Sequence, residues 1–324
     1  STMKPDKILI FGMILDGSAH CHIKHSELPK EFHLYKGRVV FQGNWVTDEM
    51  NQAALFSDLG SSPSTMEAAR IADFIGCTPG FNEEVADAEQ AYVQADMRGC
   101  ETWVNLPSMD ECREAFPDWW EAATAGMRRP VVRMNKALYG HPDSGGLWER
   151  HCEKHLLSVG FRACHENWPS MFYHAKLDLL LMVYVDDFKM AGPKANVPVG
   201  WELIRRGLRM EDPAPMGLCL GCLHHESTDT LSGVPVRRVS YDMETFLDIA
   251  VKSYESLAVK AGWTQGLKPN VQTPYFDTKE DPDDPGEPGV LAGCAASILM
   301  KVCLLYTSDA ADDSLRVDLG GRRI

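Results

Sequence analysis

Two adjacent aspartates between two apolar runs constrain the fold of this sequence most. Asp186 and Asp187 follow the run Leu179–Val185, which has the length of a strand, and precede the shorter run Phe188–Ala191. This pattern predicts a β-hairpin with the aspartates at or beside its tight turn. The two carboxylates repel each other, and solvent, a basic group or a divalent cation can relieve that repulsion. Oxygen ligands of this kind suit Mg²⁺, although a solvated turn is the more common setting for such a pair.

A third carboxylate, Asp87, stands far from this pair in the sequence. The stretch Glu84–Asp87 predicts a short strand that ends at Asp87 and turns into a helix or a tight loop. A strand end is a usual place for a metal-binding acid, and the alternative is an aspartate that caps a helix N-terminus. The distance between Asp87 and Asp186 in the fold therefore decides whether they can share a site.

A strand with two cations is expected in the second half of residues 32–43. Its alternation places Lys36 and Arg38 on one face. They are either exposed cations of an edge strand or cations that face a triphosphate, whose oxygens an arginine binds in pairs.

The spacing of apolar residues predicts four helices. The first begins with Ser64 and Glu67 at capping-box spacing and ends at Gly76. The last has one continuous apolar face and ends before Gly262. The two helices between them are expected over Leu147–Val159 and Trp201–Met210, and the last helix covers Tyr241–Ala261.

Composition limits the classes of function. The chain has 324 residues and 44% apolar residues, enough for a sizeable core and two or three subdomains. No apolar run approaches the ~20 residues that span a bilayer, so we expect no membrane association. Ten cysteines without a framework pattern favour a reducing compartment. The net charge of −14 weighs against nucleic-acid binding, although part of the acidic excess lies in residues 277–288.

Two stretches rich in histidine or cysteine are candidate zinc ligands. His20–His25 matches no zinc framework, so polar loop residues are favoured there. Cys219–His225 contains a C-x₂-C pair, but no second pair follows at the required distance, so a strand with incidental thiols is favoured. A zinc-dependent interaction module that uses either stretch is the alternative from a different class of function.

Five motifs in a common order resemble the reverse transcriptase of copia-type LTR retrotransposons, in a dinoflagellate-like variant, from about residue 32 to about residue 302. Each motif is weak evidence alone, and their shared order makes the resemblance specific. The motifs are Lys36–Val40 for a fingers strand, Asp87–Gln94 for the first palm motif, Lys136–Gly140 with Leu147 and Trp148 for a tyrosine–glycine signature, Tyr184–Asp187 for the catalytic hairpin, and Leu220–Cys222 for a strand that grips the primer.

The resemblance implies a right-hand polymerase fold of α+β class, with fingers, a palm built on an antiparallel sheet, and a truncated thumb. In such an enzyme Asp87 and Asp186 would hold two Mg²⁺ ions, with Mn²⁺ as the alternative ion, and Asp187 would support them. Two metal ions activate the primer 3′-hydroxyl and steady the triphosphate and the leaving pyrophosphate. Tyr92 matches the position whose ring lies under the sugar and rejects a 2′-hydroxyl.

The resemblance also assigns substrates and partners. Lys36 and Arg38 would face the incoming phosphates of a dNTP. Asp143 stands where the family has a glutamine near the nucleotide, and Gly146 stands where it has a basic residue, so this loop departs from the family. The expected partners are an RNA or DNA template with its primer. The ribonuclease H and integrase regions of such polyproteins are expected to be missing, and the expected location is the cytoplasm, in a retroelement particle, or the nucleus.

The leading interpretation is therefore an RNA-directed DNA polymerase, and a decayed, non-catalytic retroelement copy with residual nucleic-acid binding is the alternative.

Residues 303–324 resemble a translated sequencing adapter rather than a genuine polar tail. The expected division is 1–29 as an N-terminal linker, 30–82 as fingers, 83–107 as the first palm segment, 108–129 as an insertion, 130–228 as the palm with its hairpin, 229–276 as a thumb-like region, 277–290 as an acidic linker, and 291–302 as the start of a truncated region.

Overall fold

The computed structural model describes residues 9–13, 20–24, 34–38, 40–41, 46–47, 50, 52, 63–99, 101–105, 113–114, 117–125, 131–219 and 222–262. Before residue 40 only the backbone is described. The acidic linker and the adapter-like tail expected after residue 276 lie outside these residues, as does the region expected to begin at residue 291. The chain divides into two compact units, Ser1–Ala214 and Pro215–Ile324, and each is considered by itself.

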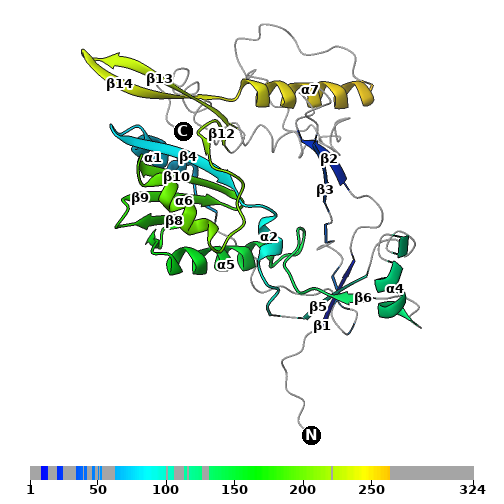
Figure 1. Ribbon diagram of the computed structural model, residues 1–324. Coiled ribbons are helices and arrows are strands. Elements are labelled where there is room, and N and C mark those ends of the chain that lie inside the picture. Colours follow the sequence, from blue (N-terminus) through cyan, green and yellow to red (C-terminus); the bar gives the residue numbers. More distant parts are fainter. Residues whose placement is uncertain are drawn as a thin grey trace, which may run out of the picture. The chain divides into compact units, whose positions relative to one another are not determined.

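A six-stranded sheet is the centre of the first unit (Figure 1). Its described neighbours pair antiparallel, and β10 lies between β4 and β9. Together with the helices around it, this sheet agrees with the expected α+β class. In spatial order the strands are β11 (Ala214–Pro215), β4 (Phe81–Asp87), β10 (Asp187–Pro193), β9 (Leu179–Tyr184), β8 (Trp168–His174) and β7 (Arg162–His165).

Side chains of β9 alternate between two cores, one on each face of the sheet. Leu179, Leu181 and Val183 pack into a cluster with residues of helices α5 and α6, whereas Leu180 and Met182 pack with helix α1. Both faces are buried because helices cover both, so β9 is a continuous apolar run instead of an alternating one. The helices are α1 (Met66–Gly76), α5 (Ser144–Ser158) and α6 (Val197–Arg205).

Smaller sheets in the first unit include strands from the segment that was expected to be a linker. β1 (Leu9–Met13) pairs parallel with β5 (Glu101–Asn105), and β5 pairs antiparallel with β6 (Val131–Arg133). β2 (His20–Lys24) pairs antiparallel with β3 (Leu34–Arg38). The remaining helices here are the short α2 (Ala91–Gln94) and α4 (Pro117–Thr124).

Helix boundaries differ from the sequence predictions where local hydrogen bonds decide them. Thr65, not Ser64, caps α1, because its Oγ1 accepts from the Ala68 N–H at 3.3 Å. Helix α5 begins at Ser144, three residues before the predicted start, so Gly145 and Gly146 are helical instead of part of a turn. Helix α6 begins at Val197 and ends at Arg205, whereas the sequence predicted a helix over Trp201–Met210.

The second unit contains a long hairpin and a helix. β12 (Leu218–Cys219) pairs with β13 (Cys222–Leu231), and β13 pairs with β14 (Val234–Asp242). The boundary expected between residues 228 and 229 falls inside β13. Helix α7 (Glu244–Lys260) starts later than predicted because its first expected residues belong to β14. Of the apolar side chains of α7, Ala250 and Ala258 are buried, whereas Leu247, Ile249 and Val259 are exposed.

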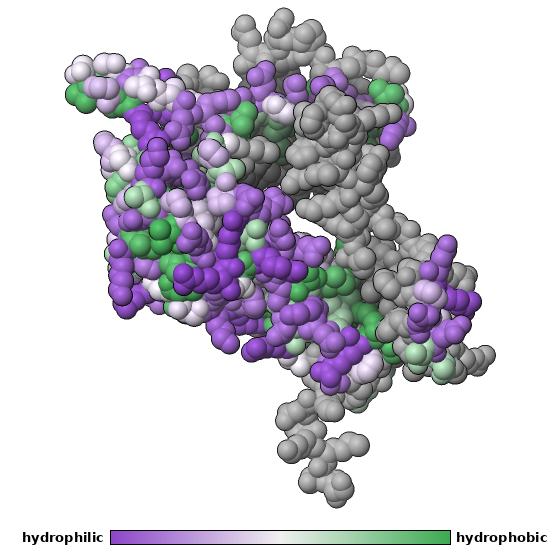
Figure 2. All heavy atoms as spheres, in the orientation of Figure 1, coloured by the Kyte–Doolittle hydropathy of each residue, from purple (hydrophilic) through white to green (hydrophobic). Residues whose placement is uncertain are grey.

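The surface of the described residues is mainly hydrophilic in the view of Figure 2. Among these residues, no helix has both the length and the apolarity that crossing a bilayer requires.

Candidate functional site

Strands β4 and β10 bring the distant aspartates together. Asp87, the last residue of β4, lies opposite Asp187, the first residue of β10, in the antiparallel register. The side chains of Asp87 and Asp187 are hydrogen-bonded to each other. The Ala88 N–H donates to the carbonyl of Asp186 at 2.7 Å, which fixes the hairpin turn beside the end of β4. Three carboxylates therefore gather at one end of two paired strands.

The turn between β9 and β10 is tight and its backbone is strained. Tyr184 pairs with Asp187, which leaves only Val185 and Asp186 in the turn. Val185 has φ of 58°, in the left-handed region that a β-branched residue rarely adopts. A positive φ at the first turn position alone is typical of a type II′ turn, which normally has glycine there. Such strain persists only where surrounding contacts hold it.

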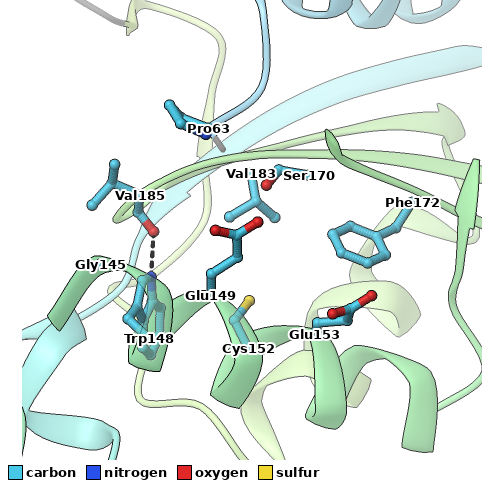
Figure 3. Close-up of a pocket in the computed structure, with 10 residues that line it drawn as sticks. All are labelled: Pro63, Gly145, Trp148, Glu149, Cys152, Glu153, Ser170, Phe172, Val183 and Val185. Atoms are coloured by element: carbon cyan, nitrogen blue, oxygen red, sulfur yellow. Dashed lines mark hydrogen bonds between the residues drawn. The ribbon is translucent and has the colours of Figure 1, made fainter. Parts of the chain in front are cut away.

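Trp148 supplies one of those contacts. Its indole Nε1 donates to the Val185 carbonyl at 2.6 Å, and the ring is buried in helix α5 directly beneath the turn (Figure 3). The hydrogen bond and the buried ring together anchor the strained turn to the helix. The sequence analysis placed Trp148 in a predicted helix and in a family motif, and neither assignment indicated this polar contact.

An apolar pocket adjoins this anchor, between α5 and the strands of the sheet (Figure 3). Phe172, Val183 and Cys152 line it, together with the acidic side chains Glu149 and Glu153. Burial raises the pKa of the Cys152 thiol far above its ordinary value, and both glutamates raise it further. This thiol is therefore protonated and acts as a small apolar side chain in the core.

Burial and charge repulsion both act on the carboxyl groups at the strand ends. Burial, the charges of Asp87 and Asp186, and the hydrogen bond to Asp87 together raise the pKa of Asp187 to about 7, with burial the largest cause. All of these effects act in the same direction. Near neutral pH the Asp87–Asp187 pair therefore holds a shared proton for part of the time.

Tyr92 lies beside this cluster on the short helix α2. Burial, and then the charge of Asp186, raise the pKa of its phenol. Its ring lies 4.5 Å from the ring of Tyr139, at an angle of 59°. The phenol therefore stays neutral at physiological pH.

Gln94 fixes helix α2, and the sequence analysis did not single it out. Its side chain donates to the carbonyls of Glu89 and Arg209 at 2.8 and 3.0 Å, and accepts from the Arg209 N–H at 2.9 Å. A buried amide with all of these partners holds the segment after Asp87 against the segment after α6. Its place at the end of the motif Asp87–Gln94 was the available signal.

The carboxylates have the chemistry that a divalent cation requires, but the side chains are not arranged around one. Oxygen-only donors with mutual repulsion fit Mg²⁺, and a cation would replace the shared proton of Asp87 and Asp187. In the described part of the chain, no group of three or more His, Cys, Asp or Glu side chains is placed to hold a metal ion. The structure thus shows a hydrogen-bonded carboxyl pair with a third acid beside it.

The remaining candidate residues lie elsewhere or outside the described side chains. Asp143 precedes helix α5; its N–H donates to His141 Nδ1 at 3.1 Å and its carbonyl accepts from the Leu147 N–H. The structure thus places it at a helix start rather than in an open loop. The side chains of Lys36 and Arg38 are outside the description, although their backbone forms β3.

The zinc alternative gains no support from the described residues. Cys219 and Cys222 are buried free thiols opposite each other in β12 and β13, as the strand interpretation predicted. His224 Nδ1 lies 3.2 and 3.1 Å from the carbonyls of Gly217 and Cys222. The side chains of His20–His25 lie outside the described residues.

No model of a known protein family matches the sequence.

Proposed function

We propose that this chain is an RNA-directed DNA polymerase of the copia type, with the right-hand polymerase fold, in which Asp87, Asp186 and Asp187 form the catalytic centre. The observation that supports the proposal is the register of β4 and β10, which sets Asp87 against Asp187 beside the Asp186 turn. These acids come from sequence positions about 100 residues apart, and an ordinary solvated turn would not gather them.

The proposed reaction transfers a nucleotidyl group from a dNTP to a primer. A bond forms between the primer 3′-oxygen and the α-phosphorus, and the bond to the leaving pyrophosphate breaks. Mg²⁺ held by Asp87, Asp186 and Asp187 would lower the pKa of the 3′-hydroxyl and neutralise phosphate charge. The shared proton of Asp87 and Asp187 would leave if these oxygens bound a cation.

The other residues of the site position these groups. Trp148 and the Ala88 N–H hold the turn, so the acids meet the substrate in a fixed geometry. The neutral ring of Tyr92, beside Asp186, would lie under the sugar and exclude a 2′-hydroxyl. The template is RNA or DNA with an annealed primer.

Primer extension on an RNA template tests the proposal. The full chain should extend a DNA primer in the presence of Mg²⁺ and dNTPs, and Asp186→Asn should abolish extension. Asp178→Asn is a matched control, because Asp178 is an exposed aspartate in the turn between β8 and β9. Extension that survives Asp186→Asn would contradict the proposal. Nucleic-acid binding without any extension would support the alternative, a decayed copy.

A further inference from the structure

Helix α5 carries its charges in separate stripes. Glu149 and Glu153 line the pocket next to the hairpin, whereas Arg150 and Lys154 line a different hollow. Residues four apart share a helix face, and like charges at that spacing destabilise a helix. In Figure 2 strongly hydrophilic side chains cover the surface over α5.

The hollow beside Arg150 and Lys154 is open and mainly basic. Arg98 also lines it, and the hollow encloses about 1,100 Å³, counting its open mouth. Its one acidic lining residue, Asp96, forms a 2.6 Å ion pair with Lys136. Cations therefore dominate the charge that this hollow presents.

A second basic hollow adjoins the first at Gly207. Arg205, Arg206 and Arg209 line it, with about 820 Å³ of open space. Arg205 is engaged with Asp212 at 2.8 Å, so Arg206 and Arg209 carry most of the accessible positive charge. The two hollows together are lined by six Arg or Lys residues and three Asp or Glu residues, although the net charge of the chain is −14.

The backbone around these hollows is held in place. His155 Nε2 donates to the carbonyls of Leu203 and Ile204, at 3.2 and 2.8 Å, which ties α5 to the end of α6. A Cβ at position 207 would lie 2.2 Å from the His155 ring, so only glycine permits this approach. Arg209 is fixed through its backbone by Gln94. The cations thus project from a rigid frame.

The pKa of His151, which lines the first hollow, reports the local field. Burial lowers this pKa most, and the charge of Lys136 lowers it further. His155 and Lys154 act in the same direction, and Asp96 opposes them. The imidazole therefore lies in a positive potential on balance, as expected where an anion would be favoured.

We propose that Arg98, Arg150, Lys154, Arg206 and Arg209, here called the α5 basic surface, bind the phosphate groups of a polyanion. Several guanidinium groups on a fixed frame match the oxygens of successive phosphates, which arginine binds in pairs. The ligand is either the backbone of a single-stranded nucleic acid or a free polyphosphate compound such as a nucleoside triphosphate. This surface would act without Mg²⁺ and does not depend on the proposed polymerase activity.

The test is salt-dependent binding of a labelled single-stranded oligonucleotide of about 12 nucleotides to the full chain, in EDTA. Lys154→Gln/Arg206→Gln removes two cations of the surface. Lys176→Gln/Arg162→Gln removes two exposed cations elsewhere and is the matched control. We expect the first variant to reduce the slope of log K against log salt by roughly 1.4, because a single strand gives ~0.7 per phosphate contact. An unchanged slope, or an equal reduction in the control, would overturn the proposal.

A competition experiment identifies the source of the phosphate. Displacement of the oligonucleotide by a nucleoside triphosphate at matched phosphate concentration assigns a free nucleotide, and failure to displace assigns a nucleic-acid backbone. NMR titration of His151 provides a second readout that does not need a variant. Inorganic triphosphate should raise the pKa of this imidazole, whereas sodium chloride at equal ionic strength should not. The same pKa with both salts would also overturn the proposal.

Discussion

Strands β4 and β10 carry two acidic clusters, and each relieves charge repulsion in its own way. The first lies in the middle of the sheet on the side of α1, where Lys189 is fully buried. Lys189 forms an ion pair with Asp73, and its Nζ lies 3.5 Å from Oε1 of Glu83. The pKa of Glu83 is raised to about 8, because burial and the charge of Asp73 raise it by more than the charge of Lys189 lowers it. One ammonium, one carboxylate and one protonated carboxyl thus balance within the fold.

The second cluster, Asp87, Asp186 and Asp187, lies at the end of the same strands. Here burial and both neighbouring acids raise the pKa of Asp187 to about 7, and no opposing charge contributes to the shift. Lys189 thus neutralises the cluster in the buried middle of the strands. At the strand ends, Asp87 and Asp187 share a proton instead. The comparison teaches that the buried cluster is neutralised within the fold, whereas in the strand-end cluster the proposed function assigns that role to an external cation.

Removing the internal cation should have the largest effect. Lys189→Met leaves Asp73 buried without its partner, so we expect the free energy of unfolding to fall by about 3–5 kcal/mol in chemical denaturation. Lys189→Met/Asp73→Leu removes both charges and should recover much of this loss. A loss below about 1 kcal/mol for the single variant would show that the ion pair does not hold the sheet.

Raising the pH should destabilise the protein through both clusters. The folded-state pKa values of Glu83 and Asp187 lie above their ordinary values, so the native state binds more protons than the unfolded state. Their stabilising contribution is complete below about pH 4 and is lost as pH rises to about 7 for Asp187 and 8 for Glu83. Stability measured without divalent cations should fall by several kcal/mol over this range, even after a discount for the partial solvent exposure of Asp187. A flat profile would contradict both shifts.

Neutralising the strand-end cluster should separate stability from activity. Asp187→Asn removes a repelling charge, so at pH 8 we expect a gain of about 1 kcal/mol, reduced by the partial solvent exposure of this group. Primer extension should be lost in the same variant. Lower stability together with retained extension would reverse the assignment of this cluster to function.

The smallest expected effect concerns the strained turn. Val185→Gly relieves the positive φ but adds freedom to the unfolded chain, so the net gain is about 0.5 kcal/mol. Val199→Gly is the contrast, because Val199 is an exposed residue in helix α6 and its replacement should cost about 1 kcal/mol. Thermal denaturation distinguishes the two, and equal losses would mean that Val185 is not strained.

Local patterns in the sequence predicted the elements of the site well. The hairpin around Asp186 and the strand that ends at Asp87 were both expected and are confirmed as elements. The sequence did not indicate that Asp187 lies directly opposite Asp87 in the strand register, and the roles assigned to Asp87 and Asp186 stay predictions. A shift of one residue in register exchanges such neighbours, and no local pattern fixes the pairing of strands so far apart.

Long-range contacts account for the other differences. A lysine in a sequence is expected in solvent, and only the fold brings Lys189 to Asp73, 116 residues away. The strands at Leu9–Met13 and His20–Lys24 form by pairing with later segments, so their own residues signal them weakly. Lys36 and Arg38 stay predictions, because their side chains lie outside the described residues.

The account depends on the strand-end carboxylates taking an external cation, and calorimetric titration of the full chain with Mg²⁺ tests this most directly. Run at pH 7 in two buffers of different ionisation enthalpy, it measures both the binding and the protons released. The account predicts binding with release of about half a proton, because the pKa of Asp187 is about 7, and loss of both in Asp187→Asn. No binding, or equal binding and proton release in Asp187→Asn, would contradict it.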